Sequence, residues 1–437
     1  MKTYILNILY FFSFFISSFI VLIINDILLL GEFYFWILLS SCGIDYLIRR
    51  KIELIHIWQI SFSFIILSEI LSFDFYSNNY SLIALKYLIM ANNILFLGYL
   101  TKKKVISLPD KLNGKTKRNN YLIFNILILF CLLLFILNIA SSFLNSLNLG
   151  RVGQDNSSSI IGSIINTIGF VLPSIICYKY VVLQKKNFII PLILSLPIFA
   201  IQFFIGTRFP LLFSIIGFGI VLFSNNTIKS LSFSKKIYII IGVFLLFQGS
   251  KFMRSFRTYG FNNSITNQTF DNNKIDGLAN NILSFGSNEG VVDMTALLIR
   301  HFNTNPHLYG ESSSFLLYFW IPRSFWPNKP TMLGNWFIRE YRSGFSEGHS
   351  ASFGFTGDLY ADFGYFSLFF IFILGILLKR AENFKDKAIN SNNFNIILGA
   401  MLYPFVFFFV RSPVTSIITF LSIILYYKLF KNILNLN

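Results

Sequence analysis

The chain is poor in charged residues. Only 13% of its 437 residues are charged, about half the share in soluble domains, whereas 54% are hydrophobic. Apolar runs of about 20 residues recur along it, and such runs cross a bilayer as helices because lipid offers no partner to an unpaired backbone group. The composition excludes a soluble globular protein and predicts an all-α polytopic membrane protein.

Cysteine and ligand-binding motifs are also scarce. The three cysteines, Cys42, Cys131 and Cys177, lie inside apolar runs at spacings that match no metal or redox motif. The sequence has neither a GxxxxGK[ST] loop nor an HExxH motif, so we expect no ATP-driven transport, no metal and no cofactor. The net charge of +17 comes without a basic, aromatic-rich soluble module, so we do not expect nucleic acid as a partner either.

The hydropathy pattern predicts about twelve transmembrane helices in a single membrane domain, 1–437, whose first span is retained. We place the spans at 4–25, 27–48, 52–72, 80–100, 121–143, 160–182, 188–205, 209–225, 237–250, 361–378, 394–410 and 413–430. With the N-terminus inside, every short Lys/Arg-rich loop falls on one side, as the positive-inside rule requires. Both termini are then cytoplasmic.

One long loop, 251–360, falls on the outer side late in the chain. The stretch 251–362 carries nine Lys or Arg residues, where the positive-inside rule does not place cations. Within the loop, 279–303 has the pattern of an amphipathic helix. The apolar segment 314–322 is too short to span and, with Trp residues nearby, is typical of a re-entrant or interfacial segment.

Arginines gather at this outer face and are candidate ligands for a lipid-linked diphosphate. An Arg side chain presents a rigid fork of donors to phosphate oxygens and stays charged. Arg208 lies in a tight GTRFP turn and Arg323 in the stiff segment IPRSFWPNKP. The other candidates are Arg254, Arg257 and Arg411. The alternative is that these side chains bind lipid headgroups at helix ends.

The segment GHSASFGFTGDLYADFGYF, from Gly348, holds the candidate acid–base residues. Asp358 and His349 are placed to accept a proton from a sugar hydroxyl. The alternative for Asp358 and Asp362 is an N-cap at the start of the following span, where Asp is favoured.

Several ionisable residues fall inside the predicted spans. They are Glu32, Asp45, Glu53, His56, Glu69, Lys86 and Lys179. Most lie within two turns of a predicted span end, so we expect their charged groups to snorkel to the interface. Lys86 lies deepest, closer to the outer face.

These features together resemble the Wzy-type O-antigen and oligosaccharide repeat-unit polymerases. The resemblance is most specific over 200–380, where the GTR turn, the late outer loop, IPRSFWPNKP and G-D-x-Y-x-x-F-G follow one another. An R-x10-G pattern associated with some members fits Arg323 with Gly334, and also Arg208 with Gly219. Many relatives have Glu and Asn at the positions of Asp358 and Asp362, so an acidic side chain is kept at the first position, which favours Asp358 as the catalytic residue.

The resemblance implies a GT-C-like glycosyltransferase in the bacterial inner membrane. It implies an undecaprenyl-diphosphate-linked oligosaccharide as substrate, membrane lipids and a chain-length regulator protein as partners, and outer-loop Arg residues on the diphosphate without a metal. An O-antigen ligase shares this architecture and donor. A lipid-linked oligosaccharide flippase and a non-catalytic assembly protein are further alternatives, although a flippase should carry its cations in a central cavity.

Overall fold

The computed structural model describes a chain in which every regular element is helical. It describes residues 14–49, 51–70, 80–101, 120–149, 160–204, 208–224, 290–321, 325–326, 328–341, 351–390 and 394–434, and these contain no strand. Over these residues the prediction of an all-α protein is confirmed, as expected in lipid, where a helix satisfies its own backbone groups.

Within these ranges, six helices are long and apolar enough to cross a membrane, and five further apolar helices are shorter. The six are 27–48, 81–101, 122–139, 165–183, 354–389 and 413–433, and the shorter ones are 14–23, 54–67, 189–203, 210–222 and 396–409. These helices establish a polytopic membrane protein. The expected span at 237–250 lies outside the described residues, so a total of about twelve spans stays a prediction.

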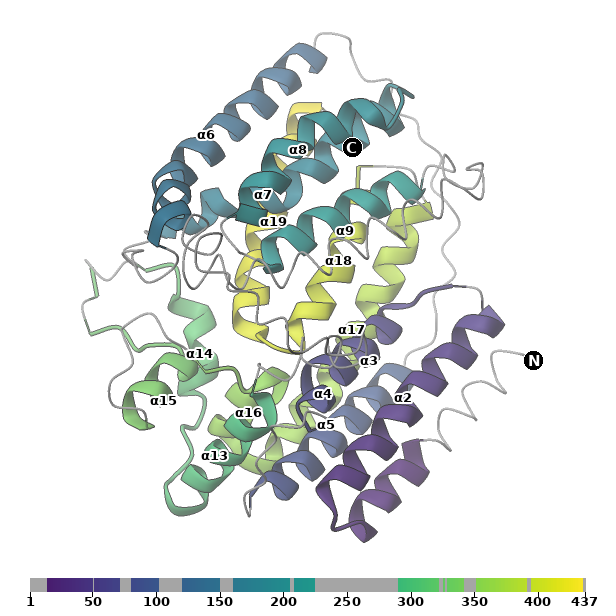
Figure 1. The fold of residues 1–437 in the computed structure, drawn as a ribbon, viewed down its shortest axis with the longest axis vertical. Helices are drawn as coiled ribbons and strands as arrows, with labels where there is room; N and C mark the ends of the chain where they lie inside the picture. Colours follow the sequence, from purple (N-terminus) through teal and green to yellow (C-terminus); the bar gives the residue numbers. More distant parts are fainter. Residues whose placement is uncertain are drawn as a thin grey trace, which may run out of the picture. The chain divides into compact units, whose positions relative to one another are not determined.

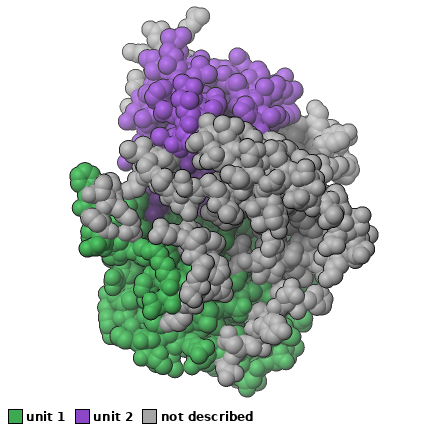
Figure 2. All heavy atoms as spheres, turned by 60° about the vertical axis from the view of Figure 1, so that its left-hand side comes forward, with its two compact units in different colours: residues 1–106, 275–383, 406–417 green, residues 107–274, 384–405, 418–437 purple. Residues whose placement is uncertain are grey.

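The helices are shown in Figure 1, and the chain divides into two compact units (Figure 2). Unit 1 comprises 1–106, 275–383 and 406–417, and unit 2 comprises 107–274, 384–405 and 418–437. Unit 1 contains α2 (Ile27–Arg49), the continuous α3–η1–α4 segment (Leu54–Phe62, Ser63–Leu67 and Ser68–Ile70), α5 (Ser81–Thr101) and the first part of α17 (Ser367–Asn390). It also contains the helices α13 (Val291–Thr304), α14 (Glu311–Tyr318), α15 (Leu333–Tyr341) and α16 (Gly357–Phe363), with the short turns η4 (Gly354–Thr356) and η5 (Gly364–Phe366).

Unit 2 is built from α6 (Asn120–Leu149), α7 (Ile160–Cys177) with η3 (Tyr178–Leu183), α8 (Ile189–Phe204), α9 (Arg208–Ser224), most of α18 (Ile396–Phe409) and most of α19 (Pro413–Leu434). Buried polar side chains tie its helices together. The Ser214 hydroxyl of α9 lies 2.8 Å from the Gly169 carbonyl oxygen of α7 and 2.9 Å from the Gln202 amide oxygen of α8. Such interhelical bonds stabilise helix association where lipid removes the hydrophobic driving force.

In unit 1, α5 and α17 approach each other at two glycines. A Cβ on Gly98 would lie 2.1 Å from the Phe372 carbonyl oxygen, and one on Gly375 would lie 1.9 Å from that of Leu95. Only glycine permits such backbone contact, which is a common way to pack helices in a membrane. This contact fixes α17, and α17 directly follows the segment that carries Asp358.

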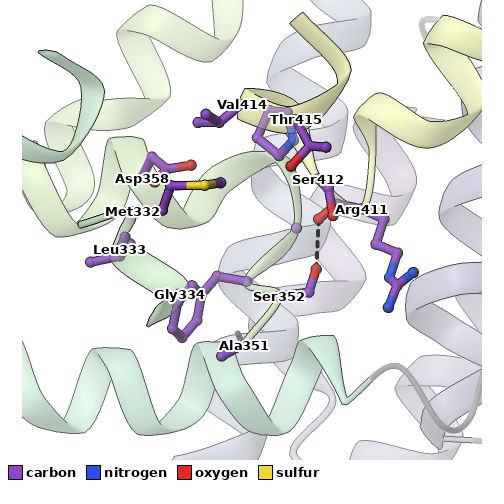
Figure 3. A pocket seen from close by; sticks show the side chains of 13 residues that line it. Met332, Leu333, Gly334, Ala351, Ser352, Asp358, Arg411, Ser412, Val414 and Thr415 are labelled. Atoms are coloured by element: carbon purple, nitrogen blue, oxygen red, sulfur yellow. Dashed lines mark hydrogen bonds between the residues drawn. The ribbon is translucent and has the colours of Figure 1, made fainter. Parts of the chain in front are cut away.

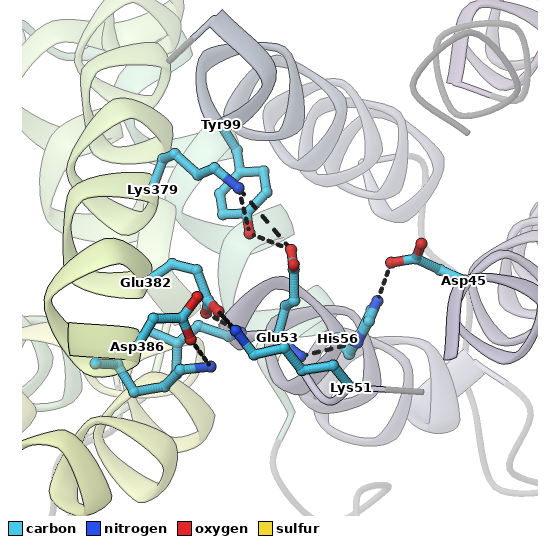
Figure 4. A network of polar contacts seen from close by, with 10 residues as sticks. Asp45, Lys51, Glu53, His56, Tyr99, Lys379, Glu382 and Asp386 are labelled. Carbon is cyan, nitrogen blue, oxygen red and sulfur yellow. Dashed lines mark hydrogen bonds and ion pairs between the residues drawn. The ribbon is translucent and has the colours of Figure 1, made fainter. Parts of the chain in front are cut away.

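A buried ionic network joins four helices in unit 1 (Figure 4). Asp45 of α2 lies 2.5 Å from the His56 ring, and Tyr99 of α5 donates to the Glu53 carboxylate at 2.9 Å. Lys379 of α17 lies 3.2 Å from the Tyr99 hydroxyl and 3.9 Å from Glu53. The snorkelling expected of Asp45, Glu53 and His56 is wrong, because all three are buried and gain ionic or hydrogen-bonded partners inside the unit.

Candidate active site

Two carboxylates of unit 1 hold the helices α13 and α14 in place. The Glu69 carboxylate, at the end of α4, accepts the backbone N–H groups of Val292 at 2.9 Å and Asp293 at 3.1 Å. The Asp362 carboxylate, on α16, accepts those of Ser312 at 2.9 Å and Ser313 at 2.8 Å. Both carboxylates accept unpaired amides in the first turn of a helix, where the helix dipole also favours a negative charge. Glu69 therefore anchors α13, and Asp362 anchors α14.

These contacts correct two expectations from the sequence. Glu69 is 3% exposed and does not snorkel. Asp362 is fully buried and caps α14, a different helix from the span it was expected to begin. Because the Asp362 carboxylate already accepts two backbone N–H groups, its role is to hold α14 in place. This leaves Asp358 as the carboxylate of α16 with capacity for chemistry.

Asp358 and Asp362 lie four residues apart, so α16 presents both on one face, toward the start of α14. The Ser312 hydroxyl donates to the Asp358 carboxylate at 2.8 Å, while the Ser312 backbone N–H donates to Asp362. Ser312 thus connects the candidate proton acceptor to the capped helix. The sequence analysis did not identify Ser312, because its role depends on a partner 46 positions away in the chain.

Asp358 lines a small pocket together with residues of the turn between α18 and α19 (Figure 3). It has a cavity volume of about 70 Å³. Its lining residues come from three segments: Met332, Leu333 and Gly334; Ala351, Ser352, Phe353, Gly354 and Asp358; and Arg411, Ser412, Pro413, Val414 and Thr415. Three hydroxyl groups and a carboxylate in one hollow suit the hydroxyl groups of a sugar.

Arg411 lines this pocket, but its guanidinium group turns away from Asp358 (Figure 3). Its carbonyl oxygen accepts the Ser352 hydroxyl at 2.7 Å, which ties the α18–α19 turn to the segment before α16. The structure therefore brings Asp358 and Arg411 to one pocket without an ion pair between them in this arrangement.

Glycine at position 334 is required by a close backbone approach. The Ala351 N–H donates to the Gly334 carbonyl at 3.1 Å, and a Cβ on Gly334 would lie 2.3 Å from the Ala351 carbonyl oxygen. Backbone atoms cannot move aside as a side chain can. Gly334, the glycine of the R-x10-G pattern, thus joins α15 to the pocket wall.

Gly334→Ala is expected to cost about 1–3 kcal/mol by overpacking and to lower activity by more than its loss of stability explains, because the clash lies in the pocket wall. Thermal unfolding of the purified protein and its activity in cells measure the two effects. Gly43→Ala on α2 is the matched control, since a Cβ there meets nothing within 4 Å. Equal behaviour of the two variants would contradict the assignment.

Helix α15 packs on α13 through aromatic rings. The His301 ring lies 5.6 Å from that of Trp336 and 6.3 Å from that of Phe337. Burial lowers the pKa of His301, and the Glu340 carboxylate opposes this shift. The imidazole is therefore suited to packing as a neutral ring, and it supports the helix that carries Gly334.

The other predicted site residues are placed only in part. Arg208 is the first residue of α9 in unit 2, and its side chain lies outside the described part of the structure. Arg254, Arg257, Arg323 and His349 also lie outside the described residues. The predicted outer helix at 279–303 corresponds to α13 from Val291 onward, and the apolar segment at 314–322 overlaps α14. Where side chains are described, no three His, Cys, Asp or Glu residues come together as a metal site.

Comparison with known proteins gives one match. The family model described as O-antigen polysaccharide polymerase Wzy matches residues 3–433. No curated protein and no solved structure matches the chain. The family match covers nearly the whole chain, including both units and the pocket.

Proposed function

Because this chain belongs to the Wzy family of O-antigen polysaccharide polymerases, we propose that it joins undecaprenyl-diphosphate-linked repeat units at the periplasmic face of the bacterial inner membrane. Membership makes it a multi-pass membrane transferase of surface-polysaccharide biosynthesis. The match over residues 3–433 carries the proposal, and the pocket around Asp358 supports it. The donor, the carrier lipid and the face of the membrane are the proposed parts.

In the proposed reaction, a terminal sugar hydroxyl of one repeat unit attacks the anomeric carbon of the growing glycan. A new glycosidic C–O bond forms, and the bond between the anomeric carbon and the diphosphate breaks. The diphosphate leaves with the bonding electron pair, still attached to undecaprenol. The hydroxyl proton passes to a carboxylate or imidazole of the protein.

Asp358 is the proposed proton acceptor, with His349 as the alternative. Asp358 lines the pocket beside three hydroxyl groups and keeps one oxygen outside its hydrogen bond to Ser312. Arg208, Arg254, Arg257, Arg323 and Arg411 are proposed to hold the diphosphate and to stabilise its charge as it leaves. Rotation of the Arg411 side chain is then required on substrate binding, because its guanidinium faces away from Asp358.

Arg323→Lys is expected to lower polymerisation nearly as much as Arg323→Ala, because Lys cannot form the forked contact that Arg makes with phosphate oxygens. Each lost charge-assisted hydrogen bond corresponds to roughly 1.5–3 kcal/mol. The length distribution of the surface glycan, at matched protein level, measures the effect. Full-length polymer with the Lys variant would remove Arg323 from the diphosphate site.

Deletion of the gene tests the function against its rivals. A polymerase deletion leaves single repeat units on the lipid core. A ligase deletion leaves long polymer on the carrier lipid, and a flippase deletion leaves repeat units facing the cytoplasm. Only the first outcome supports the proposal. A chain-length regulator protein is a further proposed partner, testable by co-purification in mild detergent.

Topology is the second part of this proposal. With both termini in the cytoplasm, the predicted loops that hold Arg208 and Arg323 lie on the periplasmic side. In unit 1, the network of Asp45, Glu53 and Lys379 joins the helix ends that this topology assigns to the cytoplasm. Reporter fusions at the two Arg positions test it, and a cytoplasmic signal at either would overturn the site.

A further inference from the structure

The last turn of α14 and the residues after it expose large apolar side chains in unit 1. Leu317 is 76% exposed, Trp320 60% and Phe325 83%. The first turn of α14 is polar and faces Asp358 and Asp362, so the polarity changes along the helix axis. A soluble surface does not usually carry such a concentrated group of apolar residues.

The backbone groups at both ends of α14 are bound by charged side chains. At its start, Asp362 accepts the N–H groups of Ser312 and Ser313. Beyond its end, the Lys329 ammonium group folds back and donates to the carbonyl oxygens of Phe319 at 3.0 Å and Ile321 at 2.8 Å. Lys329 is only 8% exposed, although a lysine near a free surface normally extends into water.

The indole of Trp320 is also hydrogen-bonded within the protein. Its indole N–H donates to the Leu317 carbonyl oxygen at 2.7 Å. The polar group of this exposed ring therefore needs no water. The first amides of α14, the carbonyls of Phe319 and Ile321 and the Trp320 indole are thus all bonded within the protein. This suits a water-poor surrounding, where each unpaired group costs several kcal/mol.

The position of α14 relative to the exposed face of α17 indicates its depth in the membrane. Asp362, which caps α14, lies three residues before Tyr365, where an exposed apolar stripe begins. The stripe continues along α17 through Phe366 at 64%, Phe369 at 54% and Ile373 at 37% exposure. This stripe belongs to a candidate membrane span, so we expect its exposed side chains to face lipid. The start of α14 thus lies level with the outer end of a lipid-facing surface.

From these contacts we propose that α14 and the turn Phe319–Ile321 lie in the membrane interface, with Leu317 and Trp320 in phospholipid at the boundary of headgroups and acyl chains. Aromatic side chains are enriched at that depth. The Ser312 hydroxyl binds Asp358, so the inserted helix holds the pocket at the level of the phosphate groups. This consequence rests on the proposed function and places the pocket where a lipid-linked diphosphate lies.

Fluorescence quenching tests the insertion. The full chain is reconstituted in phosphatidylcholine–phosphatidylglycerol vesicles as two variants, one retaining Trp58 and Trp320 and one retaining Trp58 alone, with the other Trp residues replaced by Phe. Trp58 stays in both because it is buried and donates its indole N–H to Asn92 at 2.8 Å. Their difference gives the signal of Trp320. A variant retaining Trp58 and Trp36 is the lipid control, since Trp36 is 64% exposed on a candidate span.

We expect lipids brominated near the headgroup to quench Trp320 roughly twofold more than lipids brominated near the chain end, with little quenching by aqueous iodide. Quenching by iodide alone would place Trp320 in water and overturn the proposal. Protection from both quenchers would show that protein, either another segment or a second copy, covers this surface, and would overturn it too. The measurement needs no catalysis, so a failed insertion and a failed function give separate results.

Discussion

Asp358→Asn is expected to abolish the long surface glycan and leave single repeat units on the lipid core. The amide keeps the size of the side chain and can still accept the Ser312 hydroxyl, so the pocket should fold. It cannot accept the proton of the attacking sugar hydroxyl. Loss of a positioned proton acceptor lowers rates by about 10²–10⁴-fold. The chain-length pattern in cells, and elongation of lipid-linked repeat units extracted from the deletion strain, measure the loss.

Asp362→Asn is the matched control for this variant. The amide offers one acceptor oxygen where the carboxylate accepts both Ser312 and Ser313, so α14 should lose part of its cap. We expect lower thermal stability, by about 0.5–2 kcal/mol, with chain elongation retained. A reversal, with Asp358→Asn active and Asp362→Asn inactive at full protein level, would exchange the two roles. If both variants elongate normally, the proton acceptor is His349 or another group.

Lys379→Met is expected to destabilise unit 1 by about 3–5 kcal/mol, because it removes the cation from a buried carboxylate. Glu53 is 1% exposed, and its partners in the network are Lys379 and the Tyr99 hydroxyl. Met keeps most of the volume of the lysine side chain. The loss of stability would therefore come from the lost charge and not from a cavity. Thermal unfolding in detergent measures it.

A second substitution separates charge from packing. Adding Glu53→Gln to Lys379→Met should recover most of the lost stability, since the buried charge is then removed as well. Arg380→Met is the control, because Arg380 is the exposed neighbour on the same helix. The buried pair is ruled out as the cause if the double variant is no more stable than Lys379→Met alone.

The sequence predicted the class of this protein because that class depends on local properties. Run length and hydropathy predicted helices at 27–48, 80–100 and 413–430, and the structure has helices at Ile27–Arg49, Ser81–Thr101 and Pro413–Leu434. The segments GTRFP, IPRSFWPNKP and GDLYADFG pointed to the family that the match over 3–433 confirms. These signals need no knowledge of which residues meet in space.

The roles of individual ionisable residues depended on the tertiary structure. The resemblance favoured Asp358 over Asp362 for catalysis, but the sequence did not show how the contacts of these two acids differ. Their difference follows from α14, whose first amides bind one carboxylate and whose Ser312 hydroxyl binds the other. Glu69 looked like a snorkelling acid, yet it caps a helix 223 positions later in the chain.

The sequence by itself determined that this chain is a helical membrane protein of a polymerase family, because lipid constrains each apolar segment separately. Only the folded chain decided which acid is committed to a cap, which lines a pocket with Arg411, and which pairs with Lys379. Caps, pockets and buried ion pairs form between side chains that are distant in sequence, and their free energy depends on burial that only packing creates.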